Sequence, residues 1–313
     1  MYKGSICDIQ GLMVGHAQNE DARTGCTVLW AQGGFVAGVD VRGAAPGTRE
    51  TDLLKSENMM PRINAIVLCG GSAFGLDACS GVMHALEERG VGFDVGLTKV
   101  PIVCGAVLFD LGVGDAFTRP DAQMGRQALD NTTCSPAWGH VGAGTGATVG
   151  KLLLQSVPGA QPKRSGIGTA SIRLPGGGTV AAMIAVNAAG DVYNPATGEC
   201  VACAELNGKK LPAMSLLGST GSLGAMFGLG QNTTIGVVAT DVKLSKVECN
   251  RLATVAHDGY ALAIRPVHTS ADGDTLFAIS HGEYECDPIV LQAAATEVVA
   301  RAIQNAVTEP KEE

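Results

Sequence analysis

One stretch of the sequence combines a possible nucleophile with a rigid support. The segment GLGQNTTIGVVATD, residues 228–241, sets Asn232, Thr233 and Thr234 between a glycine-rich approach and an apolar run. A threonine hydroxyl is a weak nucleophile without an adjacent base. A cut before Thr233 would create an α-amine with a reference pKa of about 7.7 to 8.0, which could act as that base on the same residue. The pattern therefore predicts self-cleavage between Asn232 and Thr233, with Thr233 as the released nucleophile.

The same residues have a purely structural interpretation as a turn followed by the start of a strand. An identical Asn-Thr-Thr triplet occurs at Asn131, so the triplet alone is not informative. The context differs, because TTCSPAW after Asn131 is typical of a loop, whereas a buried-looking strand follows Asn232. A strand would hold Thr233 rigidly at the end of a flexible arm. From the triplet alone, both interpretations stay open.

A second glycine-rich motif suggests a nucleotide site. The segment VGAGTGATVG, residues 141–150, contains the Gly-x-Gly-x-x-Ala pattern that carries pyrophosphate in dinucleotide-binding folds. That fold also needs an apolar strand just before the motif, and AWGHV is a poor one. It needs an acidic residue about twenty positions later, but the next acid after Asp130 is Asp191. A reductase is therefore a weaker hypothesis, and we expect no cofactor.

Neither a serine triad nor a metal centre is predicted. The segment GGSAFGLDA, residues 70–78, resembles a nucleophile elbow but has Phe74 where the elbow requires glycine. We expect a structural strand-to-helix turn there, with Ser72 capping the helix. Among ten cysteines only Cys200 and Cys203 have metal-like spacing, and no second pair or nearby histidine would complete a zinc site.

The composition narrows the possible partners and the compartment. The chain has 313 residues, a net charge of −8 and 4% aromatic residues, so it lacks the basic and aromatic surface that nucleic acids require. It contains no long apolar span and no secretory signal pattern. Most cysteines lie inside apolar segments, which is typical of a reducing compartment. We expect a cytoplasmic protein that binds neither nucleic acid nor membrane.

Short apolar runs recur along the chain and predict strands that are covered on both faces. The predicted strands are TVLWAQ, FVAGVDV, NAIVLCG, IVCGAVLFDL, TASIRL, TVAAMIAVNA, TIGVVAT and TLFAIS. The 43 glycines follow no fixed period, which favours turns and close backbone contacts over a repetitive structure. These patterns predict a layered α/β fold.

Three helices are predicted to cover the strands. Residues 74–89 carry an apolar stripe at helical spacing. A Ser-x-x-Glu capping box opens a second helix at residues 245–257, on which Val247 is expected to be buried. The third helix starts at Asp287 and Pro288, a favourable cap and first-turn pair.

Six motifs in order resemble a known enzyme family. They are ICDIQGLMVGHAQ, GGSAFGLDA, GAGTGATVGK, AVNAAGDVYNP, NTTIGVVATD and HTSADGDTLFA. The chain resembles the self-processing family typified by the DmpA L-aminopeptidase/D-esterase, whose relatives hydrolyse β-peptides and nylon oligomers. The resemblance implies a four-layer αββα sandwich of the DmpA and ornithine acetyltransferase type. It also implies a single domain, residues 1–313, cut into an α fragment 1–232 and a β fragment 233–313, and a homotetramer of processed protomers.

The resemblance also assigns roles to individual residues. The bond between Asn232 and Thr233 matches the scissile bond, and Thr233 matches the nucleophile. Asn187, in AVNAAGD, matches an asparagine whose amide stabilises the tetrahedral oxyanion. Lys151 matches a lysine placed in the same site, next to the oxyanion.

Asp272 and Asp274 match an acidic pair that orients the nucleophile and its ammonium in nylon-oligomer-type members. In an extended segment, the spacing i, i+2 points both carboxylates to one face. Asp272 followed by Gly273 also suits a hairpin turn, and both interpretations can hold together. Aminopeptidase-type members instead carry a serine nucleophile, with Ser and Glu at the two acidic positions. This departure leaves amide hydrolysis in place and opens the question of the substrate.

The sequence therefore predicts a self-processed amide hydrolase with an N-terminal threonine. The expected activity is that of an aminopeptidase on small peptides or amino-acid amides and esters. The alternative within the family is an endo-type hydrolase of 6-aminohexanoate oligomers. A rival of another class is a non-catalytic binding protein on the same fold, in which Asn232 and Thr233 are ordinary turn residues.

Overall fold

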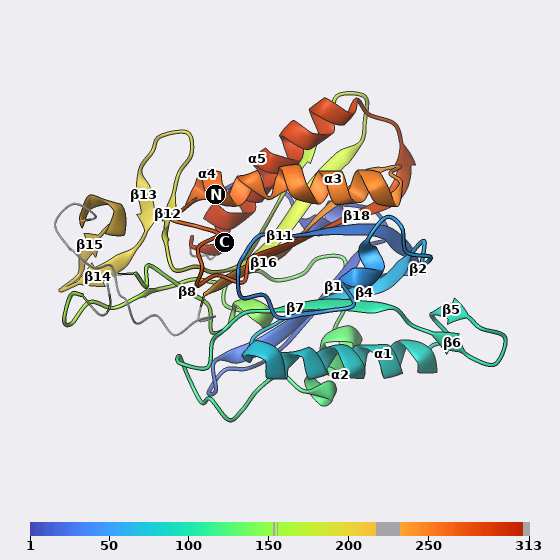
Figure 1. Ribbon diagram of the computed structural model, residues 1–313, viewed down its shortest axis with the longest axis horizontal. Helices are drawn as coiled ribbons and strands as arrows, with labels where there is room; N and C mark the ends of the chain where they lie inside the picture. Colours follow the sequence, from blue (N-terminus) through green and yellow to red (C-terminus); the bar gives the residue numbers. More distant parts are fainter. Residues whose placement is uncertain (153, 155, 217–231, 309–313) are drawn as a thin grey trace.

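The computed structural model describes residues 1–152, 154, 156–216 and 232–308. Two β-sheets lie face to face between two layers of helices (Figure 1). The helices are α1 (Ala78–Glu88), α2 (Ala122–Asp130), α3 (Lys246–Ala256), α4 (Asp258–Ala263) and α5 (Pro288–Ala306). The strands are β1 (Met13–Asn19), β2 (Thr24–Val41), β3 (Thr48–Arg49), β4 (Ile63–Cys69), β5 (Phe93–Asp94), β6 (Lys99–Val100), β7 (Val103–Val107), β8 (Thr148–Val149), β9 (Lys163–Arg164), β10 (Ile167–Arg173), β11 (Thr179–Asn187), β12 (Asp191–Tyr193), β13 (Cys200–Ala202), β14 (Ala204–Leu206), β15 (Lys209–Leu211), β16 (Thr233–Val242), β17 (Ile264–Arg265) and β18 (Thr275–Tyr284).

The long strand β2 belongs to both sheets. Its first half pairs with β1 and β4, and its second half pairs with β18. The resulting strand order is β10-β11-β16-β18-β2-β4-β7-β3. In the sheet that contains β10, β11, β16 and β18, strand β16 is antiparallel to β11 and parallel to β18. This order matters for function because it places β16 directly between two strands that carry predicted site residues.

Three apolar cores separate the four layers. One core packs the sheet of β10, β11, β16 and β18 against α3, α4 and α5, a second lies between the two sheets, and a third packs the other sheet against α1 and α2. Along β16, Val237 points into the middle core and Val238 into the core below α5, as the period of two requires. Strands buried on both faces explain the nearly continuous apolar runs. The predicted αββα sandwich is confirmed.

The predicted helix starts hold at α3 and α5. Both hydrogen bonds of a capping box form at Ser245, and the side chain of Asp287 caps α5 with Pro288 in its first turn. The prediction that Val247 is buried was wrong, because 61% of its surface is exposed. The apolar stripe of α3 runs instead through Cys249, Leu252, Ala253 and Ala256, at the spacing i, i+3, i+4, i+7. Val247 lies on the opposite side of that helix.

The turn before α1 differs from its prediction. A 3-10 segment, Ser72–Asp77, precedes the α-helix, and its cap position is Gly71, which forms no side-chain capping bond. Ser72 is therefore the first residue of this segment and not a cap. Gly71 and Ser72 both have positive φ values, 78° and 54°, so the chain turns sharply here. The carboxylate of Asp110, which accepts a hydrogen bond from the Gly71 N–H at 2.6 Å, stabilises the turn.

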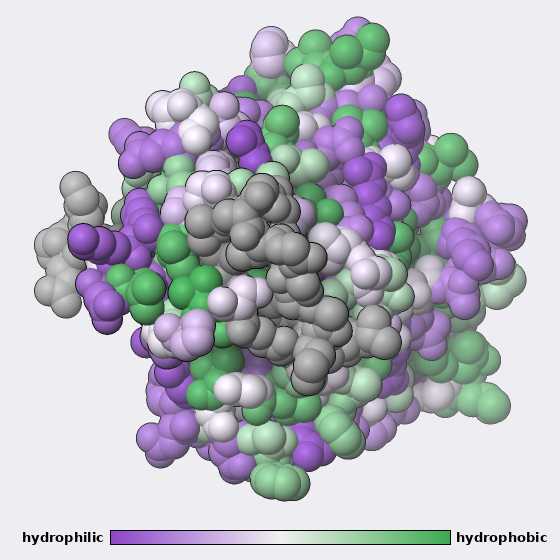
Figure 2. Space-filling model, turned by 60° about the vertical axis from the view of Figure 1, so that its left-hand side comes forward, coloured by the Kyte–Doolittle hydropathy of each residue, from purple (hydrophilic) through white to green (hydrophobic). Residues whose placement is uncertain are grey.

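The surface of the molecule mixes polar and apolar side chains. Figure 2 shows both kinds interspersed around the grey residues of one face. Among the described residues, no helix combines the length and the apolar character that crossing a membrane would need.

Candidate active site

Strand register brings the predicted site residues together at the N-terminal end of β16. Thr233 is the direct antiparallel partner of Asn187, the last residue of β11. On the other side, Asn232 forms a parallel bridge with Asp272, just before β18 begins. Residues that are far apart in the sequence therefore meet at one end of one sheet.

The carbonyl of Asn232 accepts two hydrogen bonds. The Thr233 hydroxyl donates to it at 2.5 Å, and the backbone N–H of Gly273 donates to it at 2.9 Å. Thr233 is only 3% exposed, so little water competes for these bonds. The hydroxyl thus touches the peptide that it is predicted to attack. The Gly273 N–H lies where it can stabilise negative charge on that oxygen.

The side chain of Asn232 is buried next to the predicted scissile bond. It is fully buried, and neither its Nδ2 nor its Oδ1 has a partner among the residues that the structure describes. Each buried polar atom left without a hydrogen bond costs about 1–3 kcal/mol. Among the residues that the structure describes, nothing offsets the burial of this side chain, and buried groups of this kind gather at functional sites.

Asn187 is held so that one amide hydrogen stays available. Its Oδ1 accepts hydrogen bonds from Lys151 Nζ at 2.9 Å and from Thr148 N at 3.1 Å. Its Nδ2 donates to the carbonyl of Phe109 at 2.8 Å. An amide nitrogen carries two hydrogens, so these contacts fix the orientation of the group and use only one of them. The other N–H can serve a developing oxyanion.

Lys151 places a partly buried amine beside the side chain of Asn187. Burial lowers its pKa to about 7, while the nearby carboxylates of Asp272, Asp110 and Asp274 act in the opposite direction. Besides Oδ1 of Asn187, its Nζ donates to the backbone carbonyl of Asn187 at 3.1 Å. The lysine therefore stabilises the orientation of Asn187 and brings a titratable group close to the nucleophile.

The two predicted aspartates occupy the other side of Thr233. Asp272, 2% exposed, accepts hydrogen bonds from Thr269 N at 2.7 Å and from Thr269 Oγ1 at 2.6 Å. Burial and the charge of Asp274 raise the pKa of Asp272 to about 6. Asp274 accepts a hydrogen bond from Thr234 N at 2.7 Å and two from His268. The turn expected at Asp272 lies earlier, since Asp272 N donates to Thr269 O and Asp272 itself bridges β16.

The raised pKa of Asp272 predicts a pH-dependent cost in stability. The folded chain holds this proton more tightly than the unfolded chain, whose pKa is about 3.9, so stability falls as the pH rises from about 4 to about 6. Asp272→Asn keeps an acceptor for Thr269 and removes the charge. At pH 7.5 we expect it to raise the free energy of unfolding by roughly 1–3 kcal/mol, and by much less at pH 4.5.

Urea unfolding at the two pH values measures this difference. Both proteins should carry Thr233→Ala, so that only unsplit chains are compared. An Asn variant whose advantage is the same at both pH values would contradict the assignment.

Two contacts of the site were not foreseen from the sequence. Gly273 was expected only as a turn residue, and His268 was not assigned a role. Both lie in the segment HTSADGDTLFA, which was singled out for its acids. A histidine six residues before Asp274 was a usable signal, but its contact depends on a left-handed backbone conformation that no spacing rule predicts.

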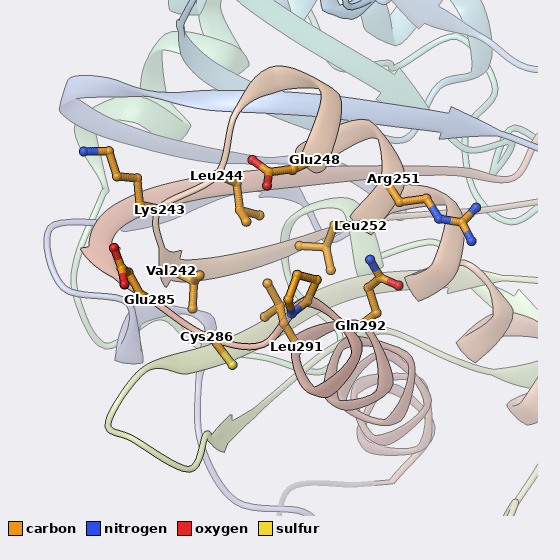
Figure 3. A pocket seen from close by; sticks show the side chains of 11 residues that line it. Val242, Lys243, Leu244, Glu248, Arg251, Leu252, Glu285, Cys286, Leu291 and Gln292 are labelled. Carbon is orange, nitrogen blue, oxygen red and sulfur yellow. The ribbon is translucent and has the colours of Figure 1, made fainter.

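The pocket in Figure 3 is separate from this site. It has a volume of about 260 Å³ and lies at the far end of β16, where Val242 and Leu252 form part of an apolar floor and Glu248 and Arg251 part of a charged rim. A strand of ten residues spans about 30 Å, which separates Val242 from Thr233.

The sequence of the chain is similar to known proteins over nearly its whole length. Residues 4–312 match peptidase family S58. The chain belongs to peptidase family S58. An uncharacterized aminopeptidase of Mycobacterium tuberculosis is 41% identical, over 96% of this chain and 92% of its own length. A 6-aminohexanoate-oligomer endohydrolase of Kocuria sp. is 30% identical, over 96% of this chain and 84% of its own length.

Two solved structures share the fold of this chain. A Burkholderia sp. beta-aminopeptidase superposes with a TM-score of 0.70 at 22% identity, covering 96% of this chain and 85% of its own. The L-aminopeptidase D-ala-esterase/amidase of Ochrobactrum anthropi, described as a variant of the Ntn hydrolase fold, gives a TM-score of 0.69 at 20% identity, with coverage of 96% and 85%. The predicted family and the predicted fold are therefore both confirmed.

Proposed function

We propose that this S58 protein is an amide hydrolase that cuts its own chain between Asn232 and Thr233 and then uses Thr233 as an N-terminal nucleophile. The single observation that carries the proposal is the Asn232 carbonyl, which accepts hydrogen bonds from both the Thr233 hydroxyl and the Gly273 N–H. The buried side chain of Asn232 also supports it, because it has no hydrogen-bond partner within the described part of the chain and separation of the fragments would let it reach water. The single domain of residues 1–313 would then consist of fragments 1–232 and 233–313.

The first step follows from these contacts. Thr233 Oγ1 attacks the carbonyl carbon of Asn232, and the Gly273 N–H stabilises the negative charge on the oxygen. The C–N bond breaks, and the nitrogen of Thr233 takes up the hydroxyl proton and becomes an amine, which leaves an ester between Asn232 and Oγ1. Water hydrolyses this ester. The products are a carboxylate on Asn232 and a Thr233 that carries both a free hydroxyl and a free amine.

The same residue then acts on substrates. The amine of Thr233 accepts the proton of Oγ1 as the hydroxyl attacks the substrate carbonyl, and the free N–H of Asn187 stabilises the oxyanion. The amine then passes the proton to the leaving group, and water releases the acyl group. Lys151 maintains the orientation of Asn187, while Asp272 and Asp274 supply negative charge for the ammonium of Thr233 or of a substrate.

The favoured substrates are small peptides and amino-acid amides or esters with a free amine, since buried carboxylates next to the nucleophile suit an ammonium group. The name of the mycobacterial relative supports an aminopeptidase, and the name of the Kocuria relative supports the alternative, an endohydrolase of 6-aminohexanoate oligomers. Hydrolysis rates on an alanyl anilide and on a 6-aminohexanoate oligomer distinguish the two. Turnover of neither substrate would contradict both.

The test of self-cleavage is intact mass with N-terminal sequencing of the purified protein. We expect two fragments, of which the smaller begins at Thr233. A single species of 31.9 kDa after long incubation would favour a non-catalytic binding protein on the same fold.

We further propose a homotetramer of processed protomers in the cytoplasm, which sedimentation of the processed protein and fractionation of the source cells would test.

Gly273→Ala is expected to slow self-cleavage by about 100-fold. A Cβ at this position would lie 2.8 Å from Thr233 Oγ1 and 2.6 Å from the carbonyl of Ala45, so the hydroxyl or the donor must move. A displacement of about 1 Å in a reacting group can cost about 100-fold in rate. The measurement is the unsplit fraction over time by mass spectrometry.

Gly33→Ala is the matched control, because its Cβ would meet nothing within 4 Å. It should leave self-cleavage unchanged. If Gly273→Ala splits as fast as Gly33→Ala, the proposed role of the Gly273 N–H is wrong.

A further inference from the structure

Asp274 is held mainly by one residue that has no assigned role. Its Oδ2 accepts hydrogen bonds from both the backbone N–H of His268, at 3.1 Å, and the ring Nδ1 of His268, at 2.8 Å. Its Oδ1 accepts the N–H of Thr234 at 2.7 Å. Asp274 is 1% exposed, so these three bonds fix the carboxylate without help from bulk water. Two of the three come from His268.

The backbone of His268 adopts an uncommon conformation to make both bonds. Its φ is +58°, in the left-handed region that residues with a Cβ seldom occupy, although histidine, asparagine and aspartate occur there more often than most. Such outliers persist where the surrounding structure stabilises them, and they cluster at functional sites. Here the result is that a main-chain donor and a side-chain donor of one residue reach a single carboxylate oxygen.

Two aromatic rings pack against the ring of His268. The ring of His257 packs against it edge to face with a centroid distance of 4.6 Å, and the ring of Tyr260 stacks on it at 6.0 Å. His257 is fully buried, and its Nδ1 lies 3.2 Å from Oδ2 of Asp40. Arg42 holds that carboxylate with an ion pair of 2.7 Å.

The hydrogen-bond partners assign the same donating nitrogen to both histidines. A carboxylate only accepts hydrogen bonds, so Nδ1 of each ring carries the hydrogen that it donates, to Asp274 from His268 and to Asp40 from His257. Each Nε2 is buried and has no hydrogen-bond partner among the residues that the structure describes. Burial lowers the pKa of His257, which favours its neutral form. Two imidazoles in contact thus connect a carboxylate at the site to a half-buried one at Asp40.

We propose that His268 is a positioning residue, which orients the carboxylate of Asp274 toward the start of β16 and through it sets the position of the Thr233 amine and hydroxyl. His257 and Asp40 keep the ring of His268 in place. The inference rests on the proposed function of Thr233. It predicts that losing the ring donor slows the chemical steps far more than it weakens substrate binding, because His268 contacts Asp274 and the carboxylate of Asp272 stays in place for a substrate ammonium.

Two variants of His268 separate the donor from the backbone. His268→Asn keeps an N–H donor close to the position of Nδ1, and His268→Gly removes it, while both residues accept a positive φ. We expect His268→Gly to lower the rate of self-cleavage and the kcat for an alanyl anilide by about 10- to 100-fold, with KM within about 2-fold. His268→Asn should recover kcat to within about 3-fold of the wild type. Thermal unfolding of each variant verifies that it is folded.

The outcomes are distinct. Wild-type kcat in His268→Gly, or an equal loss in both variants, would overturn the role of the ring donor. If His268→Gly does not fold, His257→Phe provides the second test, because it keeps an aromatic edge against His268 and removes the link to Asp40. A lowered kcat with unchanged KM supports the proposal, and an unchanged kcat overturns it. A wild-type protein that neither splits nor hydrolyses the anilide would instead refute the proposed function.

Discussion

A Thr233→Ala protein is expected to remain a single chain of 31.9 kDa and to show no measurable amide hydrolysis. The substitution removes the hydroxyl that contacts the Asn232 carbonyl at 2.5 Å, and no other nucleophile is required by the mechanism. Removing the nucleophile of an acyl-transfer enzyme lowers kcat by about 10⁴-fold or more. Intact mass reports the first effect, and release of anilide from an alanyl anilide reports the second.

Thr233→Ser is the matched control for this experiment. It keeps the hydroxyl and the future amine and loses only a methyl group, so it should still split and still turn over the anilide, at a reduced rate. A Thr233→Ala chain that breaks after residue 232 would refute self-cleavage by this residue. An unsplit chain that hydrolyses the anilide at the full rate would refute the need for the new amine.

Asn187→Asp is expected to lower kcat on the alanyl anilide by about 100- to 1,000-fold, the usual effect of losing one oxyanion donor. The variant keeps an oxygen that can accept the bonds from Lys151 and Thr148, but it loses the amide hydrogens. Self-cleavage should suffer far less, because the Asn232 carbonyl receives its donor from Gly273. The measurements are steady-state kinetics on the split protein and the time course of splitting.

Asn131→Asp serves as the control for this second prediction. Asn131 begins the other Asn-Thr-Thr triplet and is exposed, so the same chemical change there should leave both rates unchanged. Wild-type kcat in Asn187→Asp would remove Asn187 from the oxyanion site. Equal losses in splitting and in turnover would show that one donor serves both steps, contrary to the division of roles proposed here.

Local features of the sequence were sufficient for most of the secondary structure. The predicted strands appear as β2, β4, β7, β10, β11, β16 and β18, and the caps of α3 and α5 form as expected. These elements depend on the spacing of apolar residues and on short-range hydrogen bonds. The errors at Val247 and Ser72 have a different origin. Which face of a helix is buried, and whether a turn begins as a 3-10 segment, depends on the neighbours that the element packs against.

The sequence by itself determined the family, the layered fold and the choice of candidate site residues, because these follow from residue types in a fixed order. Only the tertiary structure decided their environment. The pairing of β16 with β11 and its bridge to Asp272 place Asn187 and Gly273 on opposite sides of Thr233. The left-handed backbone of His268 directs two donors at Asp274. Strand register and burial are properties of packing between distant segments, and no local pattern in the chain specifies them.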